Sequence, residues 1–218
     1  MAKKGILSMV MQPGRVKIWE DRLRDIASKG RQNLEEGMVT ESYKANKDQV
    51  IQILNRALAS EWIAFMQYWH HYFMATDIHS PEIREMFKDA AGEELHHIEE
   101  IGERVQALGG VPVDKPEDIT QQWIKSVDYG HDLRSMLEID LADERATVAF
   151  YSEIVRFCGF DDIVTRSMFE EILREEEEHA NTLADILYAY DSSTNRRTSS
   201  LHQQVAEEAI RIPQQRAA

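Results

Sequence analysis

The chain has 218 residues, of which 29% are charged, and its formal net charge at pH 7 is −14. This length suits one domain with a full hydrophobic core plus extensions. The negative charge argues against nucleic-acid binding by the protein as a whole, because phosphates require a positive surface. No apolar run reaches the roughly 18 residues of a membrane span, and the single cysteine, Cys158, cannot form an intrachain disulfide. We therefore predict a soluble, cytoplasmic protein that does not contact membranes.

Residues 1–46 differ from the rest of the chain in charge. They carry nine lysines and arginines against six aspartates and glutamates, a net charge of +3. Val16, Trp19, Leu23 and Ile26 form an apolar stripe at helical spacing. We predict a partly helical N-terminal extension that packs on the assembled protein or docks to a partner. We do not expect it to bind DNA, because its positive charge is small.

Four long segments with helical spacing of apolar residues make up most of the chain. They span about residues 47–75, 80–109, 132–157 and 161–190. Ser80 followed by Pro81 is typical of a helix start, and Gly109 followed by Gly110 is typical of a helix end. With only five prolines and ten glycines in the chain, these segments predict an all-α protein.

The connections between these segments predict the topology. Residues 76–79 and 158–160 are short, so the four helices should form two antiparallel hairpins. Residues 109–131 join the hairpins and are numerous enough to cross a whole bundle. We predict a four-helix bundle at 47–190 with one long crossover.

The segment after the fourth helix is predicted separately. A polar stretch from Asp191 to Ser200 is interpreted as a linker. It precedes a short amphipathic stretch with Leu201, Val205 and Ile212. Residues 191–218 are therefore expected to form a linker and a short C-terminal helix.

Glu-x-x-His occurs three times, and on a helix it places a carboxylate and an imidazole on one face, which suits a metal ion. The three pairs are Glu93/His96, Glu94/His97 and Glu176/His179. Glu94/His97 and Glu176/His179 fall within apolar stripes and should point into the core. Glu93/His96 falls on a charged stripe, and the glutamates at 175, 177 and 178 should face outward or flank the apolar stripe.

Each of the other two helices has one acid within an apolar stripe, Glu61 in the first and Glu144 in the third. Each hairpin thus supplies one buried Glu and one buried Glu-x-x-His, with separations of 33 residues from Glu61 to Glu94 and 32 from Glu144 to Glu176. Four carboxylates in one dry core would repel, and divalent cations remove that penalty. The pattern predicts a two-metal site built from all six residues, with an internal pseudo-twofold symmetry.

Over about residues 47–190 the sequence resembles bacterioferritins and the Dps-like proteins that carry a bacterioferritin-type centre. The matching segments are Leu54-Asn55-Arg56-Ala57-Leu58, Gln67-Tyr68, Gly110-Val111-Pro112, Asp140-Leu141-Ala142 and Glu171-Ile172-Leu173-Arg174. The resemblance implies a ferritin-like four-helix bundle with two iron ions per subunit, or manganese or zinc as substitute ions.

The resemblance also implies roles for single residues. Glu61 with His97 would hold one iron and Glu144 with His179 the other, and the bridging carboxylates would come from Glu94 and Glu176. Tyr68 matches the tyrosine beside the di-iron centre, which makes it either a redox neighbour or a core tyrosine. Leu95 stands where bacterioferritins have their haem-binding methionine, so we predict no haem. The thiol-containing Dps-like branch has a pair of cysteines near the site, whereas this chain has only Cys158. We expect Cys158 only to pack near the end of its helix.

The resemblance implies that the protein is a ferroxidase. It would oxidise Fe(II) with O2 or H2O2 and store Fe(III) mineral inside a hollow homo-oligomer of 12 or 24 subunits, protecting against oxidative stress. The alternative is a di-metal redox enzyme without storage, of the manganese catalase or peroxidase type. Di-iron oxygenases and DNA-associated protective proteins are further alternatives, whereas rubrerythrins need four cysteines that this chain lacks.

Overall fold

The computed structural model describes residues 13–32, 34–76, 80–122 and 128–211. Its elements in chain order are α1 (Pro13–Lys29), the 3-10 helix η1 (Leu34–Glu36), α2 (Lys47–Met74), α3 (Ser80–Ala107), α4 (Pro116–Gln122), α5 (Leu133–Cys158) and α6 (Ile163–Arg211). The described residues contain no strand, so the predicted all-α fold is confirmed. None of the described helices is both long and apolar enough to cross a bilayer.

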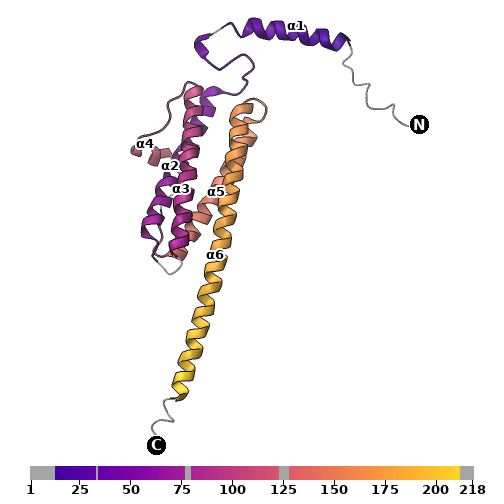
Figure 1. The fold of residues 1–218 in the computed structure, drawn as a ribbon. Helices are drawn as coiled ribbons and strands as arrows, with labels where there is room; N and C mark the ends of the chain where they lie inside the picture. The colour runs from indigo at the N-terminus through magenta and orange to yellow at the C-terminus, as the bar shows by residue number, and fades with distance from the viewer. Residues whose placement is uncertain (1–12, 33, 77–79, 123–127, 212–218) are drawn as a thin grey trace, which may run out of the picture.

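The bundle is formed by α2, α3, α5 and α6 (Figure 1). The closest packing joins α2 to α3 and α5 to α6, which are the two hairpins expected from the short connections. The helix ends have local causes. At the start of α2, Asn46 accepts a hydrogen bond from the Gln49 backbone, and Asp132 and Ser135 form a capping box at the start of α5. Gly159 ends α5 at a positive φ of 48°.

Two apolar clusters fill the core on either side of a polar layer. One cluster includes the buried residues Leu54, Leu58, Ile101, Leu108, Ile154, Phe169 and Ile172. The other includes Ile83, Phe87, Leu133, Leu137 and Leu183. On α3, α5 and α6 the buried glutamates lie between these clusters in sequence, and on α2 Glu61 lies near the end of the first cluster. The bundle brings their carboxylates together in one layer. This layer is where the predicted metal site falls.

The crossover between the hairpins contains α4, a helix that was not predicted from the sequence. This helix packs against α2 and buries Ile119. Asn55 on α2 fixes the start of the crossover, because its side chain donates to the Val111 carbonyl at 3.1 Å and accepts from the Val113 amide at 2.8 Å. The crossover is therefore attached to the bundle.

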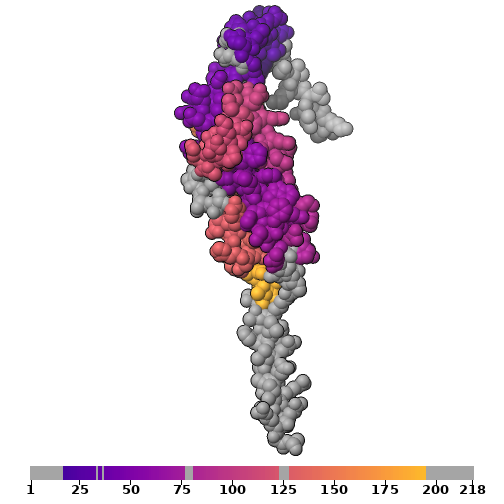
Figure 2. Space-filling model, turned by 90° about the vertical axis from the view of Figure 1, so that its left-hand side faces the viewer, coloured from indigo at the N-terminus to yellow at the C-terminus, as the bar shows by residue number. Residues whose placement is uncertain are grey.

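The N-terminal helix α1 lies beyond one end of the bundle (Figure 1), and Figure 2 shows it at the tip of an elongated molecule. Its side chains described by the structure are exposed, including Trp19 at 53% and Leu23 at 57%. The segment that follows makes contact with the bundle. Tyr43 donates a hydrogen bond to Asp162 at 3.0 Å, and the Lys44 amide donates to the Asp161 carbonyl at 3.2 Å.

The prediction of a linker after residue 190 was wrong. Residues 191–200 continue α6, which reaches Arg211 without a break and extends well past the other bundle helices (Figure 1). No glycine or proline occurs between Ile163 and Ile212. Serine, threonine and asparagine lower helix propensity by less than about 0.7 kcal/mol each, which does not end a helix. The described residues therefore contain no separate short C-terminal helix.

Candidate metal centre

The six predicted residues meet in the polar layer of the bundle. Glu61 comes from α2, Glu94 and His97 from α3, Glu144 from α5, and Glu176 and His179 from α6. Their exposed fractions range from 0% for His97 to 9% for His179, although all are polar or charged. Burial of this many ionisable groups is costly unless they are paired or bind metal.

The donor atoms fall into two overlapping groups. The first consists of Glu61, Glu94, His97 and Glu176, and the second of Glu94, Glu144, Glu176 and His179. Within each group, one donor atom from every residue lies within 4.8 Å of the others. Both groups contain Glu94 and Glu176, so two metal positions would lie side by side and share two carboxylates.

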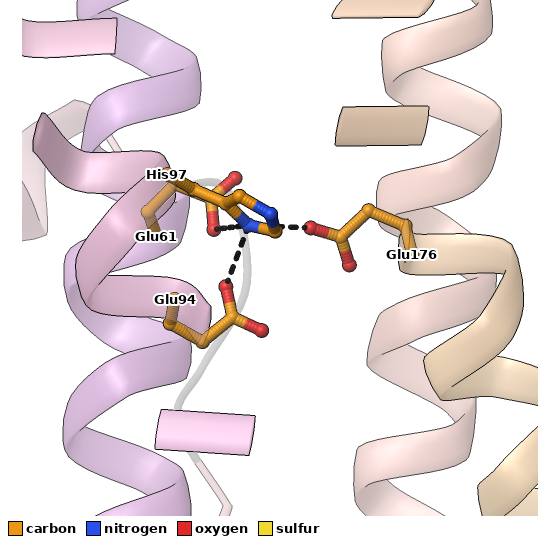
Figure 3. Close-up of side chains that lie close together, drawn as sticks. All are labelled: Glu61, Glu94, His97 and Glu176. Atoms are coloured by element: carbon orange, nitrogen blue, oxygen red, sulfur yellow. Dashed lines mark ion pairs between the residues drawn. The ribbon is translucent and has the colours of Figure 1, made fainter. Parts of the chain in front are cut away.

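Each imidazole faces a set of carboxylate oxygens. The His97 ring faces the carboxylates of Glu61, Glu94 and Glu176 (Figure 3). Its Nδ1 atom lies 3.6 Å from Glu61, 3.5 Å from Glu94 and 3.2 Å from Glu176. His179 Nδ1 repeats this arrangement, at 3.6 Å from Glu94 and 3.8 Å from Glu144 and Glu176. Donors bound at about 2.0–2.2 Å to one ion are separated by roughly 3 to 3.6 Å, so this spacing suits a shared cation.

The inward atoms lack hydrogen-bond partners within the described structure. Both side-chain oxygens of Glu94 and of Glu176 are buried without one, as are the Nδ1 atoms of His97 and His179. Each such atom costs roughly 1–3 kcal/mol when nothing compensates it. Metal ions between them would satisfy all six atoms, and mixed carboxylate and imidazole donors suit iron, manganese or zinc. The residues therefore fit a two-metal centre.

The outward atoms of the histidines contact two glutamates that were not predicted to belong to the metal site. His97 Nε2 lies 2.9 Å from Glu175, and His179 Nε2 forms a hydrogen bond with Glu93. A carboxylate only accepts, so it favours the tautomer with hydrogen on Nε2 and leaves the Nδ1 lone pair for a metal. The charged stripe on α3 thus contains a residue of the centre.

Two tyrosines contact Glu61 and Glu144, the carboxylates that each belong to only one donor group. Tyr68 on α2 donates a hydrogen bond to Glu144 on α5, and Tyr151 on α5 donates one to Glu61 on α2. Tyr151 was not among the site residues predicted from the sequence. A signal was present in the sequence, because each tyrosine follows the glutamate of its own helix by seven residues.

Comparisons with known proteins agree with this geometry. The family model described as Ferritin-like domain matches residues 51–191. The chain belongs to the ferritin-like family. It is 34% identical to the nutrient stress-induced DNA-binding protein of a Synechococcus species over 142 residues, which cover 64% of this chain and 81% of that protein.

Two solved structures are similar to this ferritin-like chain. The dodecameric thioferritin of Bacteroides fragilis, a bacterioferritin-related protein, has a TM-score of 0.67 and 31% identity, covering 70% of this chain and 92% of that one. The bacterioferritin of Desulfovibrio desulfuricans, described with its di-iron site, has a TM-score of 0.60 and 31% identity, covering 67% and 82%. These similarities confirm the predicted relationship to bacterioferritins and Dps-like proteins.

Burial and crowding raise the proton affinity of this ferritin-like centre in the metal-free chain. Burial, followed by the charge of Glu61, raises the pKa of Glu94 to about 8. Burial and the charge of Glu176 raise the pKa of Glu144 well above its ordinary value. Burial lowers the pKa of His97, but the close carboxylates of Glu176, Glu61 and Glu94 outweigh that effect and raise it. Binding of metal ions must therefore displace protons.

An acidic groove leads to the ferritin-like centre between α3 and α6. It encloses about 710 Å³ and reaches His179 and Tyr68. Its carboxylates are Glu82, Glu85, Asp89, Glu93, Glu175 and Glu178. A concentration of like charge along a groove raises the local concentration of cations. On the opposite side, a cavity of only about 20 Å³ between α2 and α5 reaches Glu144.

Proposed function

We propose that the chain is a ferroxidase that oxidises Fe(II) with O2 or H2O2 and stores the product as an Fe(III) mineral. The observation that carries the proposal is the pair of donor groups that share Glu94 and Glu176. The similarity to the Desulfovibrio desulfuricans bacterioferritin, which is described with a di-iron site, supports iron as the metal.

The six residues would divide their roles by position. Glu61 with His97 would hold one Fe(II), Glu144 with His179 the other, and both ions would be bridged by Glu94 and Glu176. Two bound Fe(II) supply two electrons, which with two protons reduce O2 to H2O2 or H2O2 to water. Four protein donors per position leave coordination positions for the oxidant. Tyr68 would be a redox neighbour through its hydrogen bond to Glu144.

Storage requires an enclosed volume, so we propose a hollow homo-oligomer of 12 or 24 copies in the cytoplasm that protects the cell against oxidative stress. The Bacteroides fragilis thioferritin is described as dodecameric, which supports the smaller shell. Native mass measurement distinguishes the two sizes. We propose no haem, because Leu95 occupies the position of the haem methionine. The Synechococcus relative is named for DNA binding, but the net charge of −14 opposes that function here.

The test is anaerobic titration with Fe(II), followed by exposure to air or to H2O2. The expected result is saturation at two Fe(II) per chain, oxidation on exposure, and iron retained in the assembly after desalting. His97→Ala should abolish rapid oxidation. His96→Ala is a matched control on the same helix, because the His96 side chain is 64% exposed.

The main alternative is a di-metal redox enzyme without storage. Manganese or zinc could occupy the same donors as substitute ions. Sustained H2O2 disproportionation by the manganese-loaded protein, with no iron retained after exposure to air, would exclude the storage function and favour a catalase-type activity.

A further inference from the structure

The outer contacts of the metal centre cross between the two hairpins. Glu61 and His97 both belong to the α2–α3 hairpin. Their outer contacts, Tyr151 and Glu175, both belong to the α5–α6 hairpin. The ligands of the first position are thus contributed by one hairpin, and their outer hydrogen-bond partners by the other.

The second position shows the same relationship in reverse. Glu144 and His179 belong to the α5–α6 hairpin, and they contact Tyr68 and Glu93 of the α2–α3 hairpin. The pattern is also present in the sequence. Glu93 directly precedes the shared Glu94, just as Glu175 directly precedes the shared Glu176.

These four contacting residues differ in burial in a way that bears on their role. Tyr68 and Tyr151 are 2% and 0% exposed, and their hydroxyl groups have carboxylates of the centre as hydrogen-bond acceptors. The side chains of Glu93 and Glu175 are 57% and 44% exposed. Burial therefore does not force these two glutamates onto the histidines, and each is free to be hydrated by solvent instead.

We propose that Tyr151 and Glu175 are positioning residues for the Glu61/His97 position, and that Tyr68 and Glu93 are positioning residues for the Glu144/His179 position. The proposal rests on the proposed function only in requiring that the six buried residues bind two metal ions. A metal-binding side chain that already makes a hydrogen bond to an outer partner is held in one orientation before the metal arrives. Each hairpin therefore orients the ligands that the other hairpin contributes.

The experiment measures Co(II) binding by its visible absorption, using chains in which only one position remains intact. His179→Ala leaves the Glu61/His97 position, and His97→Ala leaves the Glu144/His179 position. Glu175→Ala, placed in the His179→Ala chain, should weaken Co(II) binding about 10- to 100-fold, the usual effect of removing an outer partner of a metal ligand. The same substitution in the His97→Ala chain should change the affinity less than about twofold.

The reciprocal substitution gives the opposite result if the contacts cross. Glu93→Ala should weaken Co(II) binding in the His97→Ala chain and leave it unchanged in the His179→Ala chain. Tyr151→Phe should behave as Glu175→Ala does. Glu175→Gln retains an acceptor oxygen and should lose less affinity than Glu175→Ala. Glu177→Gln, at an exposed position on the same helix, is the matched control.

Three results would overturn the proposal. The first is that a substitution weakens Co(II) binding equally in both single-position chains, and the second is that it weakens binding in neither. The third is that it weakens binding only at the position whose ligands come from the same hairpin as the substituted residue. Failure of the unsubstituted chain to bind two Co(II) would instead overturn the proposed function together with this inference. The exposed glutamates keep the test decisive if Tyr151→Phe does not fold, and native mass and helical circular dichroism verify assembly in each variant.

Discussion

Arg104 Nη2 donates a hydrogen bond to Asp162 Oδ1 at 2.8 Å, which joins the last turns of α3 to the residue before α6. Both side chains are buried, at 6% and 1% exposure. Asp162 also accepts hydrogen bonds from Tyr43 and Thr165. This cluster therefore connects the two hairpins and the segment before α2 at one end of the bundle.

Removing Arg104 should leave the Asp162 carboxylate buried without its cation. Arg104→Ala is expected to lower the free energy of unfolding by about 3–5 kcal/mol. Arg156→Ala is the matched control, because its ion pair with Glu153 is 68% and 73% exposed and should contribute less than about 1 kcal/mol. Urea midpoints at fixed protein concentration measure both effects, and equal midpoints for the two variants would contradict the prediction.

Truncation should separate α1 from the segment that follows it. Deleting residues 1–32 removes a helix whose described side chains are exposed, so the melting temperature should change little. Deleting residues 1–46 also removes the Tyr43 hydrogen bond to Asp162 and the helix cap at Asn46, and it should lower the melting temperature by several degrees. Similar melting temperatures for the two truncated proteins would show that the second segment contributes nothing.

Loss of Glu94 or Glu176 should weaken metal binding at both positions, whereas loss of Glu61 or Glu144 should weaken it at one. Glu176→Gln is expected to weaken both Fe(II) positions, because both donor groups contain Glu176. Glu61→Gln should weaken one and leave about one Fe(II) bound per chain. Glu177→Gln, outside the acidic groove, is an exposed control from the same helix. Anaerobic equilibrium dialysis gives the stoichiometry, and loss of one ion in both buried variants would argue against bridging by Glu176.

The stability of the metal-free protein should fall as pH rises from about 5 to 8. The pKa of Glu94 is raised from 4.5 to about 8, and those of Glu144 and His97 are raised in the same direction. The folded chain therefore binds more protons than the unfolded chain in this range. The stabilisation is complete below the unfolded pKa values and is lost as pH rises through the folded ones.

Melting temperatures in the presence of a chelator test this dependence. Glu94→Gln should flatten the profile relative to Glu99→Gln, an exposed control on the same helix. Saturating Mn(II) should reverse the slope, because metal ligands must be deprotonated and metal affinity rises with pH. A chelated wild-type protein whose melting temperature rises steadily from pH 5 to 8 would contradict the assignment of protons to the centre.

The six inward residues could be predicted because each is a polar interruption of an apolar stripe on one helix. That test needs only the helical period, and it distinguished Glu94 from Glu93 for the inward position. It could not show that Glu93 and Glu175 turn toward histidines of the opposite hairpin. Such contacts depend on how the hairpins are rotated against each other, which single-helix periodicity does not contain.

Other differences between prediction and structure have similarly local causes. The helix α4 has only seven residues, which is too short for a clear periodic signal. The stretch from Asp191 to Ser200 was interpreted from its polarity, although it contains no residue that breaks a helix. A polar composition shows only that a segment does not pack against a core. Both an exposed helix and a linker have such a composition.

The uninterrupted course of α6 sets a dimension for any assembly of this chain. From Asp191 to Arg211 the helix adds about 30 Å at 1.5 Å per residue. A closed shell must accommodate one such rod per subunit, either within its lumen or outside its wall. Rods directed inward would reduce the volume left for mineral, and rods directed outward would enlarge the hydrodynamic radius without adding capacity.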